Sequence, residues 1–140
     1  KALSLKNPPK RALIIAGDTV IVYNNRVLGK PRHQAEAMRF LASLSGKTHV
    51  VLTGLAVYNT LSRQACTAIV KTSVTFRKLT TEELKAYIRT GEYIGKAGGY
   101  GIQGHGALLI QKIVGDYYNV VGLPLVATAT LLKKACRKIK

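Results

Sequence analysis

Acidic residues are scarce in this 140-residue chain, and their scarcity limits the kinds of site that it can form. Six Asp and Glu residues face 22 Lys and Arg residues, which gives a formal net charge of +16. A metal centre built from several carboxylates has few residues to draw on, whereas anionic ligands are attracted to such a surface. Nucleotides, nucleic acids and anionic membrane surfaces are all ligands of this kind.

The chain is also poor in cysteine and lacks metal-ligand patterns. Cys66 and Cys136 lie far apart, no CxxC motif or Cys/His cluster is present, and the three histidines have no zinc-ligand spacing. We therefore expect two free thiols in a reduced, cytoplasmic protein, with a disulfide as the alternative. No apolar run approaches the roughly 18 residues of a membrane span, and no signal peptide is visible, so we expect no membrane partner.

The pattern of apolar and turn residues predicts a single domain in which strands and helices are interspersed. The expected strands are Arg11–Gly17, Thr19–Tyr23, Arg26–Leu28, Thr48–Tyr58, Gln64–Arg77, Ala107–Val114 and Tyr117–Val121. The expected helices are Gln34–Leu44, Thr81–Arg89, which follows a capping box, and a last helix from Pro124 onward. The class is α/β with a mixed sheet, and α+β is the alternative.

Two positions near the start of the chain could carry chemistry. Asp18 follows the first apolar strand, beside Gly17, and a carboxylate there suits a general base or a metal ligand. A turn or capping aspartate is the alternative. Lys30 lies in a turn with Arg32, and two such cations can hold a phosphate group. A solvated loop is the alternative for Lys30.

The segment Gly95–Gly106 (GKAGGYGIQGHG) is the most informative stretch. Its glycines allow backbone N–H groups to approach a phosphate or a base. Lys96 adds charge, Tyr100 offers a ring for stacking, and Gln103 offers an amide that both donates and accepts hydrogen bonds. The segment matches neither a P-loop nor a dinucleotide fingerprint. Loops this long are typically functional, although a flexible glycine loop is the alternative.

Six short motifs, in order, resemble those of the Maf family of nucleotide pyrophosphatases over nearly the whole chain. They are Ala16–Val20 (AGDTV), Leu28–Pro31 (LGKP), Leu44–Thr53 (LSGKTHVVLT), Val74–Phe76 (VTF), Lys96–Gly104 (KAGGYGIQG) and Tyr118–Leu125 (YNVVGLPL). The resemblance implies an elongated, two-lobed, inosine-triphosphatase-like fold around a curved mixed sheet with flanking helices. It also implies hydrolysis of nucleoside triphosphates to monophosphate and pyrophosphate, with Mg²⁺ or Mn²⁺ as cofactor.

The resemblance assigns roles to individual positions. It implies that Asp18 is the proton acceptor and that Thr19 and Gln103 are tied to substrate choice, and the lysine of the family's KP motif falls on Lys30. The residue types themselves make Asp18 a candidate metal ligand, and Lys30 with Lys96 and Gln103 with Tyr100 candidates for binding substrate. A family lysine upstream of the GDT motif aligns with Lys1 only through a gap. Together these positions imply the dTTP/UTP-specific subfamily in a house-cleaning role, with modified pyrimidine triphosphates as further substrates. A homodimer is expected by analogy.

Three family features have no counterpart in the sequence. They are an SxSPRR-type phosphate-binding loop, the acidic stretch that follows it, and an Asp that many members carry where Gly95 stands. We expect one Maf-like domain, residues 1–140, without the family's N-terminal phosphate-binding segment. Two alternatives to an active pyrophosphatase stay open: a truncated protein that binds nucleotide without turnover, and a basic nucleic-acid-binding module. For the latter no RNP, KH or zinc-finger signature is present.

Overall fold

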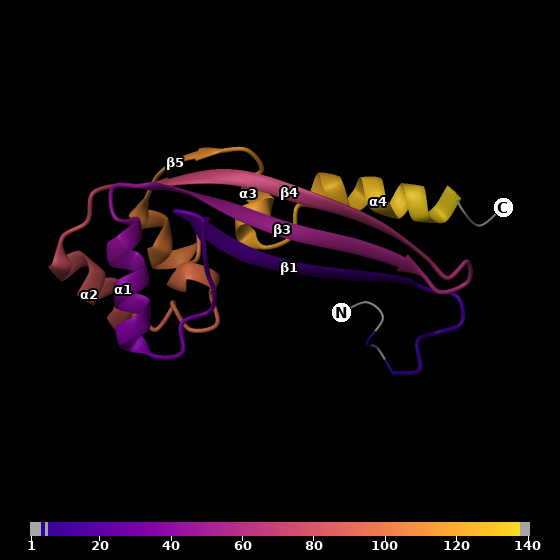
Figure 1. The fold of residues 1–140 in the computed structure, drawn as a ribbon, viewed down its shortest axis with the longest axis horizontal. Coiled ribbons are helices and arrows are strands. Elements are labelled where there is room, and N and C mark those ends of the chain that lie inside the picture. Colours follow the sequence, from indigo (N-terminus) through magenta and orange to yellow (C-terminus); the bar gives the residue numbers. More distant parts are fainter. Residues whose placement is uncertain (1–3, 5, 138–140) are drawn as a thin grey trace.

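The computed structural model describes Ser4 and residues 6–137 and contains one five-stranded sheet with the strand order β2-β1-β3-β4-β5 (Figure 1). The strands are β1 (Leu13–Tyr23), β2 (Arg26–Leu28), β3 (Thr48–Asn59), β4 (Gln64–Phe76) and β5 (Ile110–Val114). The helices are α1 (Gln34–Leu44), α2 (Thr81–Arg89), α3 (Tyr117–Val121) and α4 (Leu125–Arg137), with 3-10 turns η2 (Ala97–Gly99) and η3 (Gly104–Leu109). In this part of the chain, no helix combines the length and apolarity needed to cross a membrane.

The expected α/β class, with helices flanking the sheet, is confirmed, but each strand pair that the structure describes is antiparallel. We expected a mixed sheet. Short turns explain the difference: Asn24 and Asn25, with φ of 48° and 57°, join β1 to β2, and residues 60–63 join β3 to β4. The chain then passes from β2 through α1 to β3, which lies on the other side of β1.

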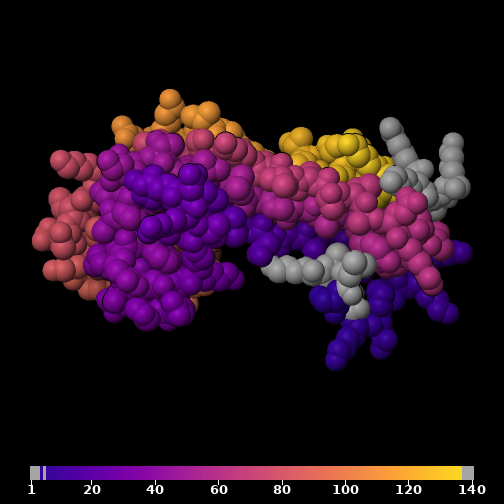
Figure 2. Space-filling view, viewed as in Figure 1, coloured from indigo at the N-terminus to yellow at the C-terminus, as the bar shows by residue number. Residues whose placement is uncertain are grey.

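β1, β3 and β4 run along the length of the molecule and connect two unequal ends (Figure 1). We call the broad end the head; it holds α1, α2 and residues 90–109. We call the narrow end the arm; it consists of the outer halves of the three strands with α4 packed against β3 and β4. The space-filling view shows the broad head, with the residues of α1 in purple, and the narrower arm beside it (Figure 2). The expected elongated shape with two lobes is therefore present.

Each end has its own apolar core, and one face of β3 serves both. The odd-numbered residues of β3 from His49 to Asn59 are buried, as the two-residue period of a strand requires. In the head, Val51 packs with residues of α1, α2 and β4. In the arm, Leu55 and Val57 pack against α4. Cys66 and Cys136 are both free, which confirms the expected thiols.

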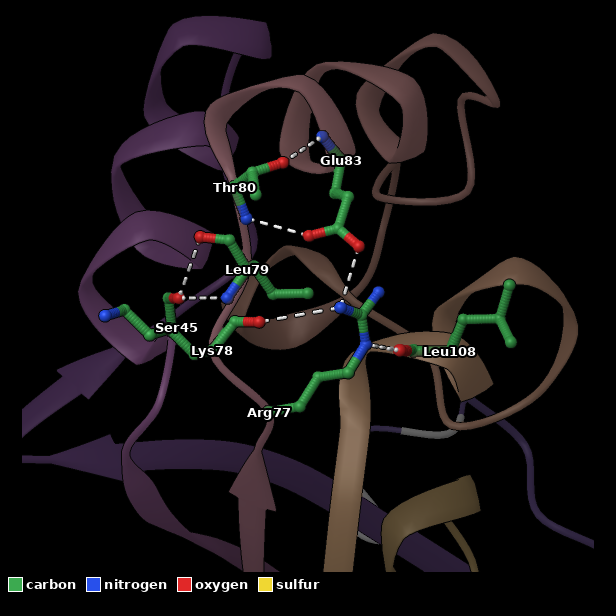
Figure 3. Close-up of polar contacts among 7 residues, drawn as sticks. All are labelled: Ser45, Arg77, Lys78, Leu79, Thr80, Glu83 and Leu108. Atoms are coloured by element: carbon green, nitrogen blue, oxygen red, sulfur yellow. Dashed lines mark hydrogen bonds and ion pairs between the residues drawn. The ribbon is translucent and has the colours of Figure 1, made fainter.

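Polar contacts fix α2 to its neighbours in the head (Figure 3). Thr80 and Glu83 form the expected capping box, with Thr80 Oγ1 accepting from the Glu83 amide at 3.2 Å and Glu83 Oε2 accepting from the Thr80 amide at 2.8 Å. Arg77 joins this cap to η3, because it pairs with Glu83 at 2.8 Å and donates through Nε to the Leu108 carbonyl. Ser45 ties the end of α1 to Leu79.

Three sequence expectations on element bounds were wrong. Tyr117–Val121 is the helix α3 rather than a strand, because Asp116 caps it by accepting from the amides of Tyr118 and Asn119. The strand expected over Ala107–Val114 begins only at Ile110, since the residues before it belong to η3. The two strands expected on either side of Asp18 are one continuous strand, β1, in which Asp18 lies opposite Gly54 of β3.

Asn119 attaches α3 to the sheet. Its side chain is fully buried, and its Nδ2 lies 3.1 Å from the Val51 carbonyl and 3.0 Å from Thr72 Oγ1. Thr72 in turn bonds both the amide and the carbonyl of Asp116, at the start of α3. The side chains of Asn119 and Thr72 together therefore fix the position of this short helix on β3 and β4.

Replacing Asn119 should destabilise the protein measurably. Asn119→Ala removes the buried donor to the Val51 carbonyl and leaves the Thr72 hydroxyl with its bonds to Asp116 alone, so we expect the free energy of unfolding to fall by about 2 kcal/mol or more. Urea denaturation measures this change. Tyr118→Ala, on the exposed side of the same helix, is the matched control and should cost less than about 1 kcal/mol. Equal losses in the two variants would contradict the anchoring role.

Candidate active site

A cavity of about 750 Å³ lies at the junction of β1, the glycine-rich segment and the end of α3. Its wall includes residues far apart in the sequence, from Gly17 on β1 to Gly122 after α3. Six residues singled out from the sequence line it: Asp18, Thr19, Lys30, Lys96, Tyr100 and Gln103. Lys1, the seventh, lies outside the described residues. The fold thus brings these six candidates together. Arg32, which we expected to hold phosphate beside Lys30, does not line the cavity, and its Nε lies 3.4 Å from Glu36 Oε2.

β1 contributes neighbouring residues that leave the strand in opposite directions. Thr19 lies opposite Thr53 of β3, and their hydroxyl oxygens are 2.8 Å apart, which fixes the Thr19 side chain. Alternation along the strand directs Asp18 to the other face. Asp18 is exposed and borders the cavity on a stretch of β1 that, among the described residues, pairs only with β3. The aspartate is therefore a mid-strand residue, not the strand-end residue that we expected.

Close backbone approach brings the glycine-rich segment against β1 and Lys30. The Gly98 amide donates to the Gly29 carbonyl at 2.9 Å, directly before Lys30. Gly98 has φ of 66°, and a Cβ there would lie 2.6 Å from Cδ1 of Ile21. Only glycine satisfies both conditions without a shift of Ile21. The segment thus has a defined course, and it places Lys96 on the same cavity wall as Lys30.

Tyr100 lies mostly in the head core, although it reaches the cavity wall. The residue is 5% exposed, and its hydroxyl lies 2.6 Å from His49 Nε2. Its ring packs edge-on against Phe76 and His49. Burial raises the pKa of the Tyr100 hydroxyl, and it raises that of Tyr87 to about 12. So little of the Tyr100 ring is accessible that the geometry favours support of the loop over stacking on a base.

Lys96 and Gln103 are exposed residues that flank the turn containing Tyr100. Each has extended backbone geometry and immediately precedes a 3-10 turn, Lys96 before η2 and Gln103 before η3. Neither side chain is used as a cap for its turn. The positive charge of Lys96 and the amide of Gln103 therefore lie at the two ends of the loop that lines the cavity.

The sequence reasoning missed Glu92, a second carboxylate in the cavity wall. It lies 2.7 Å from Nδ1 of His105 and accepts from the backbone amides of His105 and Gly106. These donors, the His105 side chain first, lower the pKa of the Glu92 carboxyl. The available signal was its rarity, since an acid directly before a glycine-rich segment stands out in a chain with six acids.

A family model described as Maf-like protein matches residues 1–135. The chain belongs to the Maf-like protein family. Its curated relatives include a dTTP/UTP pyrophosphatase of Moorella thermoacetica, 53% identical over 121 residues, which cover 86% of this chain and 62% of that relative. A dTTP/UTP pyrophosphatase of Dictyoglomus turgidum is 46% identical over 125 residues, 89% of this chain and 65% of the relative.

A third relative, the dTTP/UTP pyrophosphatase of Bacillus cytotoxicus, is 45% identical over 134 residues, 96% of this chain and 69% of its own length. The chain thus spans about two thirds of the length of these relatives. The similarity covers both the head and the arm, because a match over residues 1–135 includes nearly the whole of α4. The resemblance inferred from six short motifs is confirmed.

His49 should make the folded protein sensitive to acid. Burial lowers the pKa of His49 from 6.5 to about 4, so the imidazole is neutral in the folded protein. As the pH falls from about 6.5 to about 4, the unfolded chain takes up a proton that the folded protein does not. The free energy of unfolding then decreases by about 3 kcal/mol from this residue alone.

His49→Gln tests this expectation, because glutamine can still bond the Tyr100 hydroxyl but does not titrate. Urea unfolding at pH 7 and pH 4.5 should show a smaller loss of stability on acidification in this variant than in the unmodified protein. His33→Asn is the control: His33 is exposed at the start of α1, and asparagine retains the capping group. An identical acid loss in all three proteins would contradict the assignment.

Proposed function

We propose that the protein is a nucleoside triphosphate pyrophosphatase that hydrolyses dTTP and UTP to the monophosphate and pyrophosphate. The observation that carries the proposal is the single cavity to which Asp18, Lys30, Lys96 and Gln103 all contribute. These side chains cover the three needs of the reaction: a proton acceptor, cations for the phosphates and an amide for the base. The names of relatives up to 53% identical support the choice of substrate.

In the proposed reaction, water attacks the α-phosphorus and pyrophosphate leaves. Asp18 accepts the proton of the attacking water, a role that a carboxylate in hydrogen-bond reach of bound water can fill. Lys30 and Lys96 stabilise negative charge on the phosphate oxygens as it develops, since fixed cations need no reorganisation during the reaction. Holding water and phosphate together in the cavity adds to the rate by removing the entropic cost of their encounter.

A divalent cation, Mg²⁺ or Mn²⁺, is part of the proposal. Within Ser4 and residues 6–137, no three His, Cys, Asp or Glu residues are grouped as a metal site. Mg²⁺ does not need such a group, because it is often held by one or two carboxylates together with substrate phosphates. Asp18, exposed at the cavity, would hold the ion in this way, and the ion would neutralise phosphate charge when bound.

Base recognition falls to Gln103, with Thr19 also lining the cavity. Thymine and uracil each present an N–H donor flanked by two carbonyl oxygens. An amide can accept from this N–H and donate to one of the carbonyls at the same time. This pairing fits the pyrimidines with a 4-carbonyl group and explains how one glutamine can serve both dTTP and UTP.

The charge distribution favours nucleic-acid binding as a second candidate function. All six acids lie outside the arm: none occurs in residues 1–17, 37–81 or 117–140. The arm exposes Arg63 at its tip and Lys133 and Lys134 on α4. Filter binding of single-stranded DNA at increasing salt would support this function if affinity were high and fell steeply with salt.

A cytoplasmic location and a homodimer remain predictions.

Asp18→Asn should lower pyrophosphate release from dTTP at least about 100-fold, because the amide cannot accept the proton. The assay measures phosphate after inorganic pyrophosphatase is added, with Mg²⁺ or Mn²⁺ present. Glu82→Gln, which also removes one carboxylate but on an exposed turn of α2, should leave the rate unchanged. An unchanged rate in Asp18→Asn would rule out its role as proton acceptor.

A further inference from the structure

The carboxylate of Glu92 binds the end of the glycine-rich segment at His105 and Gly106. Its Oε1 accepts from the His105 amide at 3.1 Å and lies 2.7 Å from His105 Nδ1, while its Oε2 accepts from the Gly106 amide at 3.2 Å. Thr90 also holds the backbone of Glu92, since the Thr90 hydroxyl accepts from the Glu92 amide at 3.2 Å. One carboxylate therefore satisfies two consecutive backbone donors and a side chain.

The turn that Glu92 holds is sterically restricted to glycine at two places. Gly104 has φ of 65°, and a Cβ there would lie 2.6 Å from Glu92 Oε1. A Cβ at Gly106 would lie 2.0 Å from the Gly101 carbonyl oxygen. The backbone from Gly101 to Gly106 thus folds tightly back on itself and onto the carboxylate. Little room is left for this turn to take another course while Glu92 is bound to it.

Gln103 lies within this turn, directly before Gly104. Its side chain is exposed, and it makes no capping bond to η3. A glutamine amide that is free to rotate by 180° exchanges its donor and acceptor, so it can pair with the N–H and 4-carbonyl of uracil or with the 4-amino group and ring nitrogen of cytosine. A glutamine alone therefore cannot choose between these bases. Choice requires that its backbone be held in one place relative to the sugar and phosphate sites.

We propose that Glu92 is a positioning residue for substrate choice. By fixing the His105 and Gly106 amides, it fixes where the Gln103 side chain leaves the backbone, and hence the preference for triphosphates with a 4-carbonyl pyrimidine over those with a 4-amino pyrimidine. The inference rests on the proposed pyrophosphatase function. Glu92 acts through the loop, whereas Gln103 is the residue that would contact the base.

Glu92→Ala tests the proposal through the ratio of kcat/KM for dTTP to kcat/KM for dCTP. We expect this ratio to fall at least about 10-fold, because two unheld amides leave Gln103 free to pair with either base. The loss should appear mainly as a higher KM for dTTP. Glu92→Gln keeps the shape and one acceptor oxygen, so it should recover part of the preference. Glu82→Ala, which removes an exposed acid elsewhere, is the matched control and should keep the ratio.

Hydrogen exchange provides a readout that does not depend on turnover. The His105 and Gly106 amides should exchange faster in Glu92→Ala than in the unmodified protein, and at unchanged rates in Glu82→Ala. Unchanged amide exchange, or an unchanged dTTP/dCTP ratio, in folded Glu92→Ala overturns the proposal. If the unmodified protein hydrolyses no triphosphate, the pyrophosphatase function fails. The preference is then measured as the ratio of the dissociation constants of non-hydrolysable dCTP and dUTP analogues. A ratio in Glu92→Ala equal to that of the unmodified protein again overturns the proposal.

Discussion

The antiparallel pairing of β1 with β3 is the constraint on which the candidate site depends. It sets Thr19 against Thr53 and places Ile21 beside Val51, so that residues of both strands form the floor of the cavity. The same strand β3 presents the Val51 carbonyl to the buried side chain of Asn119. The floor and the α3 wall are therefore held by neighbouring positions of one ladder, and a shift in its register would separate them.

The remaining wall of the cavity, formed by the glycine-rich segment, depends on how closely a glycine backbone can approach that floor. Gly98 passes so close over Ile21 that a Cβ would require the Ile21 side chain to shift, and its amide donates to the Gly29 carbonyl. Lys30 and Lys96 are thereby brought to one cavity although 66 positions separate them in sequence. This close approach explains the glycine at position 98 and sets the two cations around one cavity.

Local signals in the sequence predicted the secondary structure correctly where residues close in the sequence decide the conformation. The bounds of α1 and α2 follow from apolar spacing and from the capping box at Thr80, and the structure matches both. They were insufficient for Tyr117–Val121, whose aromatic and β-branched residues favour a strand. Capping by Asp116 and the bonds of buried Asn119 to two strands decide for a helix there, and those bonds cannot be seen in sequence.

The same distinction between local and distant contacts explains why one carboxylate of the site was found from the sequence and the other was not. Asp18 could be found because it follows an apolar run, although its mid-strand place depends on the length of β3 opposite. Glu92 could not be assigned, because its partners lie 13 and 14 residues further along a loop. The bonds that engage Glu92 also lower its pKa, which makes its carboxylate a weak proton acceptor. Of the two carboxylates on the cavity wall, Glu92 is thus suited to hold the loop, whereas the proposed reaction uses Asp18 as the proton acceptor.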